Sequence, residues 1–77
     1  MDPKEVFLVQ ECQNGEWTVD SVYSTYELAE KQAWVLYDNS SENVMVRVSS
    51  AYLNTNNAPF VLLAIVNGTP CYSTKTI

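Results

Sequence analysis

Apolar residues are interspersed with polar ones along two stretches near the N-terminus, residues 5–13 and residues 16–23, and each stretch is predicted to form a β-strand. The Asn14-Gly15 pair between them is a strong hairpin signal, because both positions of a two-residue turn must tolerate positive φ. Such a turn also fixes the register of the strands. The predicted pairs are Gln13 with Glu16, Cys12 with Trp17, Val9 with Asp20 and Phe7 with Val22.

This hairpin would present two faces of different character, because side chains alternate between the faces of a strand. The more apolar face is expected to lie on the core, and it comprises Val6, Leu8, Cys12, Trp17, Val19 and Tyr23. The other face mixes apolar and acidic side chains, a combination that suits a partner-binding surface. It comprises Phe7, Val9, Glu11, Thr18, Asp20 and Val22.

A capping box, Ser24-Thr25-Tyr26-Glu27, follows the hairpin and predicts a helix over residues 25–37 with Ser24 as the cap. At 100° per residue, one side of this helix carries Leu28, Ala29, Ala33 and Leu36, with Tyr26 at the margin. Trp34 falls among the charged residues of the opposite side. Two interpretations of Trp34 stay open, namely partial burial against the following loop or chain end, and a direct contact with a partner.

The C-terminal half predicts three further strands. Residues 43–53 alternate, with Val44, Val46 and Val48 inward and Met45, Arg47 and Ser49 outward. Residues 60–66 are continuously apolar, as expected of a central strand covered on both faces. Asn67-Gly68 is a second hairpin turn, and residues 71–76 should form an edge strand that Pro70, which lacks an N–H, can begin. We therefore predict one α+β domain over residues 1–77, with one helix packed on a mainly antiparallel sheet in the order ββαβββ.

The charges are distributed unevenly along this chain of 77 residues with a net charge of −5. All nine acidic residues lie within residues 2–42, whereas residues 43–77 contain two basic residues and no acid. The acidic half would repel nucleic acid and membrane phosphates and attract a basic protein surface. No apolar run approaches the roughly 20 residues that span a bilayer, and no signal-peptide pattern precedes the first strand. We expect an intracellular, cytoplasmic protein that binds neither membrane nor nucleic acid.

The residues that most enzymes and metal sites need are missing. The chain has no histidine, only two cysteines without CxxC spacing, and two glycines that both lie in predicted turns. We therefore expect no metal, no cofactor and no enzymatic activity. An enzyme that uses Cys12 or Cys71 as a nucleophile is the least favoured alternative.

What remains is binding to another macromolecule. The candidate partner-binding residues are Phe7, Glu11, Asp20, Trp34 and Met45. Glu11 and Asp20 would supply negative charge beside Phe7 on the mixed face of the hairpin. Trp34 is a residue type enriched at binding hot spots, and Met45 offers an adaptable apolar contact.

Three segments resemble the phage uracil-DNA glycosylase inhibitor family. The resemblance is carried by the run Phe7-Leu8-Val9-Gln10-Glu11-Cys12, by Tyr37-Asp38 with Glu42-Asn43-Val44-Met45, and by Pro59-Phe60-Val61-Leu62-Leu63 with Asn67-Gly68. It implies an acidic protein that mimics DNA and blocks a repair enzyme, with Glu11 as the phosphate mimic and Met45 helping to receive an apolar side chain. Unlike the family pattern, this chain places a hairpin directly after the first strand. The architecture also resembles small phage anti-defence proteins, including some anti-CRISPRs.

The sequence thus predicts a small, acidic, non-enzymatic inhibitor of phage or mobile-element type. Its expected partner is a host protein with a basic nucleic-acid-binding surface, in the cytoplasm of the host cell. The alternative is a structural or assembly subunit that forms a homo-oligomer, such as a homodimer, through an edge strand.

Overall fold

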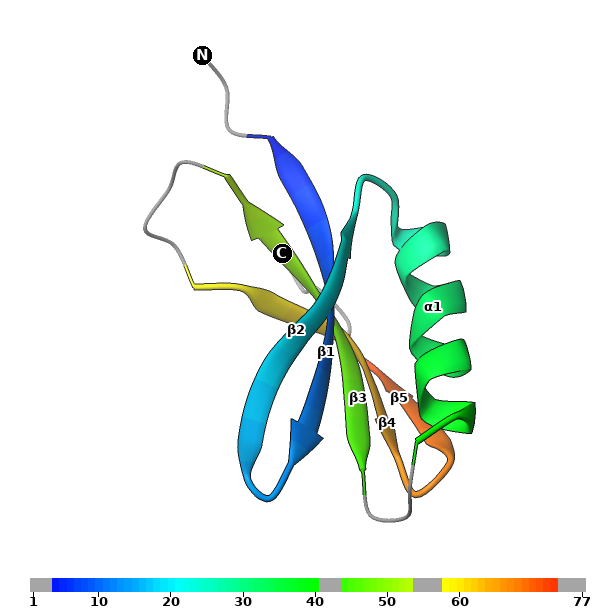
Figure 1. Cartoon of the computed structure of the whole chain (residues 1–77). Helices are drawn as coiled ribbons and strands as arrows, with labels where there is room; N and C mark the ends of the chain where they lie inside the picture. Colours follow the sequence, from blue (N-terminus) through cyan, green and yellow to red (C-terminus); the bar gives the residue numbers. More distant parts are fainter. Residues whose placement is uncertain (1–3, 41–43, 54–57, 74–77) are drawn as a thin grey trace.

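The fold is known from a computed structural model that describes residues 4–40, 44–53 and 58–73. These residues form one antiparallel sheet of five strands and one helix (Figure 1). The elements along the chain are β1 (Glu5–Gln13), β2 (Glu16–Tyr23), α1 (Tyr26–Asp38), β3 (Met45–Tyr52), β4 (Phe60–Val66) and β5 (Thr69–Tyr72). The predicted α+β class and the ββαβββ order are confirmed. The later part of the predicted last strand, residues 74–76, lies outside the described residues.

Both Asn-Gly turns form as predicted, and each joins two neighbouring strands. Asn14 and Gly15 have φ of 54° and 82°, and Asn67 and Gly68 have φ of 52° and 77°. Two consecutive positive φ values define the tight hairpin turn that matches the twist of the strands it joins. The sheet order is β2-β1-β3-β4-β5, so the two hairpins lie at opposite edges and β3 joins them in the centre.

The register of the first hairpin agrees with the prediction only near the turn. Gln13 pairs with Glu16 and Cys12 with Trp17 as predicted, but the register shifts between Val9 and Gln10. The shift leaves Asp20 as an extra residue in β2, which is a β-bulge. The predicted pairs beyond it were wrong, and the observed pairs are Val9 with Ser21 and Phe7 with Tyr23.

The helix covers the face of the hairpin that was expected to be free, so the assignment of the two faces was wrong. Val9 lies opposite Val48 of β3, and Val48 lies opposite Leu63 of β4. These fully buried side chains form one core beneath the helix. Its members are Val9, Ala29, Ala33, Val44, Val46, Val48, Leu63 and Ile65. Because apolar residues occur on both faces of the first hairpin, only its pairing with β3 determines which face becomes the core.

The helix packs through two small residues. Ala29 and Ala33 are fully buried, as predicted, and their small side chains permit a close approach to the sheet. Leu28, expected on the same side, is 51% exposed, and Leu36 is half-buried. Trp34 packs against the core and does not lie on the polar side. The buried side of the helix is therefore rotated from Leu28 towards Trp34.

The helix begins one residue later than predicted. Thr25 is the N-cap, with an extended φ of −129°, and its hydroxyl accepts a hydrogen bond from the Leu28 backbone N–H at 3.4 Å. This contact satisfies one of the backbone donors that every helix leaves unpaired in its first turn. The predicted cap, Ser24, lies just outside the helix.

Candidate functional site

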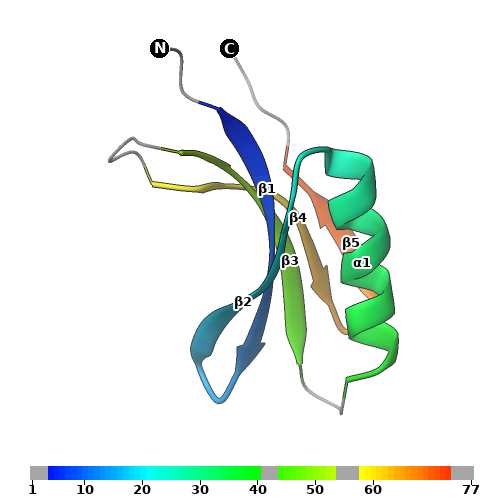
Figure 2. The same ribbon diagram turned by 45° about the horizontal axis from the view of Figure 1, so that its top comes forward.

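The sheet is covered by the helix on one face only. We call the other side the open face, and Figure 2 shows that no other described helix or strand lies against it. The strand pairing assigns to this side the positions that alternate with the core residues. They include Leu8, Gln10 and Cys12 of β1, Trp17, Val19 and Val22 of β2, Met45, Arg47 and Ser49 of β3, and Val61 and Ala64 of β4.

The open face carries more apolar side chains than is usual for a sheet face exposed to solvent. An antiparallel sheet with one solvated face normally carries polar side chains there. Here Val19 and Val22 are each 53% exposed and Met45 is 37% exposed, while Leu8 and Trp17 are half-buried. Other large apolar side chains, such as Leu28, Val35 and Tyr72, are exposed outside this face, but Val19, Val22 and Met45 share one side of the sheet. Large exposed apolar patches are a feature of interaction sites.

A network of polar side chains lies in the middle of this apolar surface. The Nε of Arg47 donates a hydrogen bond to Oε1 of Gln10 at 2.8 Å, and the Ser49 hydroxyl donates to the same oxygen at 2.9 Å. Gln10 is only 9% exposed and Ser49 is fully buried. The amide oxygen of the buried Gln10 therefore accepts hydrogen bonds from both Arg47 and Ser49 and restricts their side chains.

The guanidinium of Arg47 is also stacked on an aromatic ring. Its central carbon lies 3.9 Å from the centroid of the Trp17 ring, within cation–π range. Gln10 is the cross-strand partner of Arg47, and Trp17 extends from the next strand, so three strands contribute to the arrangement. The hydrogen bond and the stacking contact together restrict the orientation of the guanidinium plane.

Arg47 has no carboxylate partner among the described residues. Within this part of the chain its guanidinium makes one hydrogen bond, to Gln10, and one ring contact, with Trp17. A guanidinium has five N–H donors, so the four on its two terminal nitrogens are left for water or for a bound group.

Of the five predicted partner-binding residues, only Met45 lies on the open face. It is the exposed first residue of β3, and its cross-strand partner in β1 is Cys12. Asp20 lies in the bulge of the β2 edge strand, where it is exposed and its carboxylate accepts a hydrogen bond from the Ser21 hydroxyl at 3.0 Å.

The other three residues lie on the helix side. Phe7 is half-buried and meets Tyr26 edge-to-face, with ring centroids 6.2 Å apart. Trp34 is half-buried and packs edge-to-face on Tyr37 at 6.3 Å. Glu11 accepts a hydrogen bond from the Ser40 hydroxyl at 3.4 Å, just beyond the helix. The five residues therefore do not form one continuous surface.

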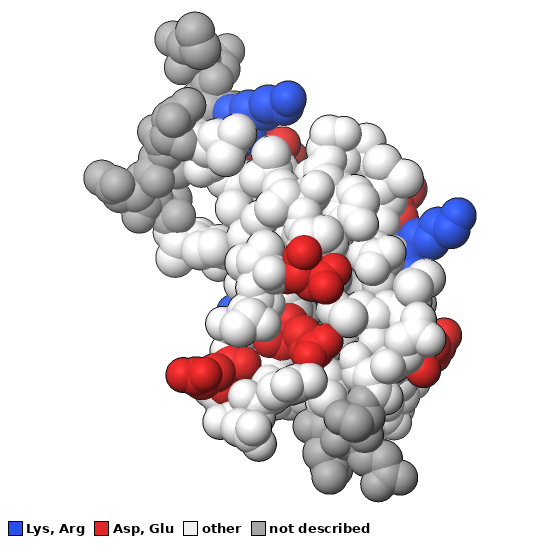
Figure 3. Space-filling view, viewed as in Figure 1, with Lys and Arg blue, Asp and Glu red and all other residues white. Residues whose placement is uncertain are grey.

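Acidic side chains nevertheless gather on one side of the molecule. Figure 3 shows them over the centre and lower left of the view, in the region of the β1–β2 hairpin, with basic side chains towards the margins. Glu11 and Glu16 belong to this region, because the pairs Glu11–Thr18 and Gln13–Glu16 share the helix side of the hairpin. These two carboxylates therefore lie on the side of the sheet opposite to Arg47.

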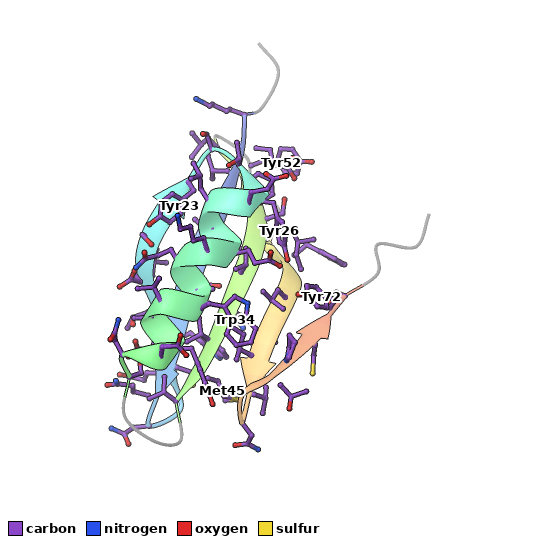
Figure 4. All side chains as sticks on the ribbon, turned by 90° about the vertical axis from the view of Figure 1, so that its right-hand side faces the viewer. Tyr23, Tyr26, Trp34, Met45, Tyr52 and Tyr72 are labelled. Atoms are coloured by element: carbon purple, nitrogen blue, oxygen red, sulfur yellow. The ribbon has the colours of Figure 1, made fainter. Side chains whose placement is uncertain are left out.

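A second cluster joins the helix to the edge strand β5. The hydroxyls of Tyr26 and Tyr72 donate hydrogen bonds to the same carboxylate oxygen of Glu30, at 2.9 and 3.3 Å (Figure 4). Burial, followed by the hydrogen bond to Glu30, raises the pKa of Tyr26 above its ordinary value of 10.0. Both phenols therefore stay protonated at neutral pH, and the cluster has the character of a structural bridge.

The two cysteines are free thiols in different environments. Cys12 is buried beside Trp17, whereas Cys71 is exposed on the edge strand. Among residues 4–40, 44–53 and 58–73, no group of three or more histidine, cysteine, aspartate or glutamate side chains could hold a metal ion. None of the helical segments within these ranges has the length and apolar character needed to cross a membrane.

Comparison with known proteins gives no relative: no family model, no curated protein and no solved structure matches this chain. The candidate site is therefore defined by its geometry alone. Sequence reasoning placed Met45, Arg47 and Ser49 on one side of their strand, but it did not select Gln10, Trp17 or Arg47 as a group. The missing information was that β1 lies beside β3, which no local pattern indicates.

Proposed function

We propose that this chain is a small protein-binding domain without catalytic activity, and that its partner docks on the open face of the sheet. The observation that carries the proposal is the exposure of Val19, Val22 and Met45 around a stacked tryptophan–arginine pair. Tryptophan and arginine are two of the residue types that contribute most to protein interfaces, usually near the centre and surrounded by apolar contacts. The open face has this composition.

We further propose that binding inhibits the partner, as a small phage-type inhibitor of a host nucleic-acid-processing or defence protein would. The proposal is supported by the resemblance to the inhibitor family and by the acidic hairpin. Glu11, Glu16 and Asp20 would attract a basic protein during the encounter. Apolar contacts on the open face would then hold the complex.

A homo-oligomer is the second candidate, because an exposed apolar face could equally be covered by another copy. Assembly through the strand edges is opposed by the sequence of both edge strands. The β2 edge carries a charged bulge at Asp20, and the short β5 edge contains Pro70, which cannot donate a ladder hydrogen bond. Face-to-face packing is therefore the form in which a homodimer would be expected.

Site-specific photo-crosslinking tests both candidates. A photoreactive amino acid is introduced at Val22 on the open face or, as a matched control, at Leu28 on the outer side of the helix. The two positions are almost equally exposed, at 53% and 51%. We expect a discrete adduct with another protein from Val22 and none from Leu28 when the chain is expressed in bacterial cells.

The mass of the adduct separates the outcomes. An adduct of twice the mass of the chain would identify the homodimer. Adducts that form equally well from both positions, or from Leu28 alone, would contradict docking on the open face.

A further inference from the structure

We infer that Arg47, stacked on Trp17, is a receptor for a carboxylate side chain of the partner protein, and that the partner presents this acidic residue within an apolar surface. The inference rests on the proposed docking face and specifies the chemistry that it recognises. Its basis is one preorganised cation without a carboxylate partner among the described residues, placed in the centre of an apolar surface.

The guanidinium of Arg47 is preorganised for binding. Arg47 makes a hydrogen bond to Gln10 through Nε, and its central carbon lies over the Trp17 ring. Gln10 is itself held by the buried Ser49 hydroxyl. A guanidinium that is already fixed loses less conformational entropy when it binds a ligand. The geometry thus favours a planar acceptor that can take two parallel hydrogen bonds, which a carboxylate provides.

The positive charge of Arg47 lies where a docked partner would remove water from it. Arg47 is half-buried, and on the open face it lies over Trp17 and beside Gln10, whose partner on the other side is the exposed Val19. A partner that covers these apolar side chains would remove water from the guanidinium. A charged group that is desolvated without a counter-ion is costly, so the partner must supply one. An apolar partner surface lacking an acid would therefore bind poorly.

A single cation on the open face suits one carboxylate better than a polyanion. Among the described residues that pair with a neighbouring strand on the open face, Arg47 is the one basic residue. The net charge of the whole chain is −5. A polyanion such as nucleic acid needs several cations along its backbone and would be repelled by the acidic hairpin. A single carboxylate needs only one cation.

A second copy of the chain is a poor occupant for the same reason. None of the described paired positions on the open face carries a carboxylate. Two copies packed face to face about a two-fold axis would therefore bring two guanidinium groups together without an acid between them. The observations favour a different protein that carries the missing acid.

The test uses a displayed library of short random peptides, selected on the immobilised full chain and on its Arg47→Gln variant. We expect the wild-type chain to enrich peptides in which Asp or Glu is flanked by apolar residues, and the variant to lose this enrichment. Replacing the acid of a selected peptide by its amide should weaken binding about ten-fold or more, as expected when a charge-assisted bidentate pair is lost. Arg47→Lys should lose a similar amount, because lysine provides neither the fork nor the stacking.

Controls separate loss of the receptor from loss of the fold. Lys31→Gln removes one positive charge from the exposed side of the helix and should leave the selection unchanged. Thermal unfolding of Arg47→Gln and Arg47→Lys confirms that both variants are folded during the selection. Labelled oligothymidylate is the probe for a nucleic-acid partner, and binding that depends on Arg47 would overturn the inference.

Two further outcomes decide between this inference and the docking face itself. If Val22→Glu abolishes peptide binding but the enriched peptides lack acids or bind Arg47→Gln equally well, the carboxylate receptor is refuted and the docking face stands. If peptide binding is unaffected by both Val22→Glu and Arg47→Gln, both are refuted. Failure of the wild-type chain to retain more acidic peptides than Arg47→Gln also counts against the receptor.

Discussion

Replacing Gln10 by methionine should destabilise the protein well beyond what an ordinary surface change would cost. Methionine has a similar length and unbranched shape, so the substitution mainly removes the amide. The oxygen of this amide accepts hydrogen bonds from Arg47 and Ser49. Because Ser49 is fully buried, its hydroxyl would be left without an acceptor and without access to water.

The size of the effect follows from these two contacts. A buried polar group left unsatisfied costs about 1–3 kcal/mol. The half-buried Arg47 can regain water at its Nε and should add less. We therefore expect Gln10→Met to lower the free energy of unfolding by about 2 kcal/mol. In a domain of this size that corresponds to a fall of roughly 8–16 °C in Tm.

The double variant Gln10→Met with Ser49→Ala gives the sharper comparison, since replacing both partners removes the orphaned hydroxyl. It should be more stable than Gln10→Met alone by about 1 kcal/mol. Urea denaturation followed by tryptophan fluorescence measures all variants. Gln13→Met, the same change at an exposed strand end, is the control and should cost less than about 0.5 kcal/mol. A Gln10→Met variant as stable as this control, or a double variant less stable than the single one, would refute the reasoning.

Three other outcomes follow from the structure. Leu36→Ala should lower the free energy of unfolding by about 2 kcal/mol because Leu36 packs against the core, whereas Leu28→Ala should lower it by less than about 0.5 kcal/mol. Equal losses of stability in urea denaturation would show that the buried face of the helix is misassigned. The raised pKa of Tyr26 means that the unfolded chain loses this phenol proton at a lower pH than the folded protein does, so the free energy of unfolding should fall as pH rises above about 10. The fall should be less steep in Tyr26→Phe. Parallel plots of stability against pH for the two proteins would contradict this. A thiol reagent should modify the exposed Cys71 in the native protein and the buried Cys12 only after unfolding. Equal modification rates of the two thiols in the native protein would contradict this expectation.

The parts of the fold that local sequence determines were predicted correctly. The Asn14-Gly15 and Asn67-Gly68 turns require only local backbone chemistry. The alternation of Val46 and Val48 with Arg47 likewise fixes the two faces of β3 without reference to any other strand. These features depend on residues within a few positions of one another.

The errors arose where tertiary packing decides between local alternatives. The first hairpin has apolar residues on both faces, and Val9 becomes buried only because Val48 lies beside it. Asp20 forms a bulge without a glycine to signal it. Trp34 was placed on the polar side because the helical wheel weighted Leu28, but the large indole ring reaches the core from the flank of the helix.

The candidate site could not be predicted from the sequence because its members come from different strands. Gln10 and Arg47 are brought together by the pairing of β1 with β3, and Trp17 is added by the pairing of β1 with β2. Each residue taken alone suits an ordinary strand position. Their joint meaning appears only when the strand order is known.

The most direct test of the docking face is the affinity of a partner isolated with the unmodified chain, measured by titration calorimetry for two variants. Val22→Glu and Leu28→Glu add the same charge at positions of similar exposure on opposite sides of the molecule. A charge buried at an interface without a counter-ion is strongly unfavourable. We predict that Val22→Glu weakens binding about ten-fold or more while Leu28→Glu binds like the wild type. Undiminished binding by Val22→Glu together with a loss in Leu28→Glu would place the interface on the helix and contradict the account.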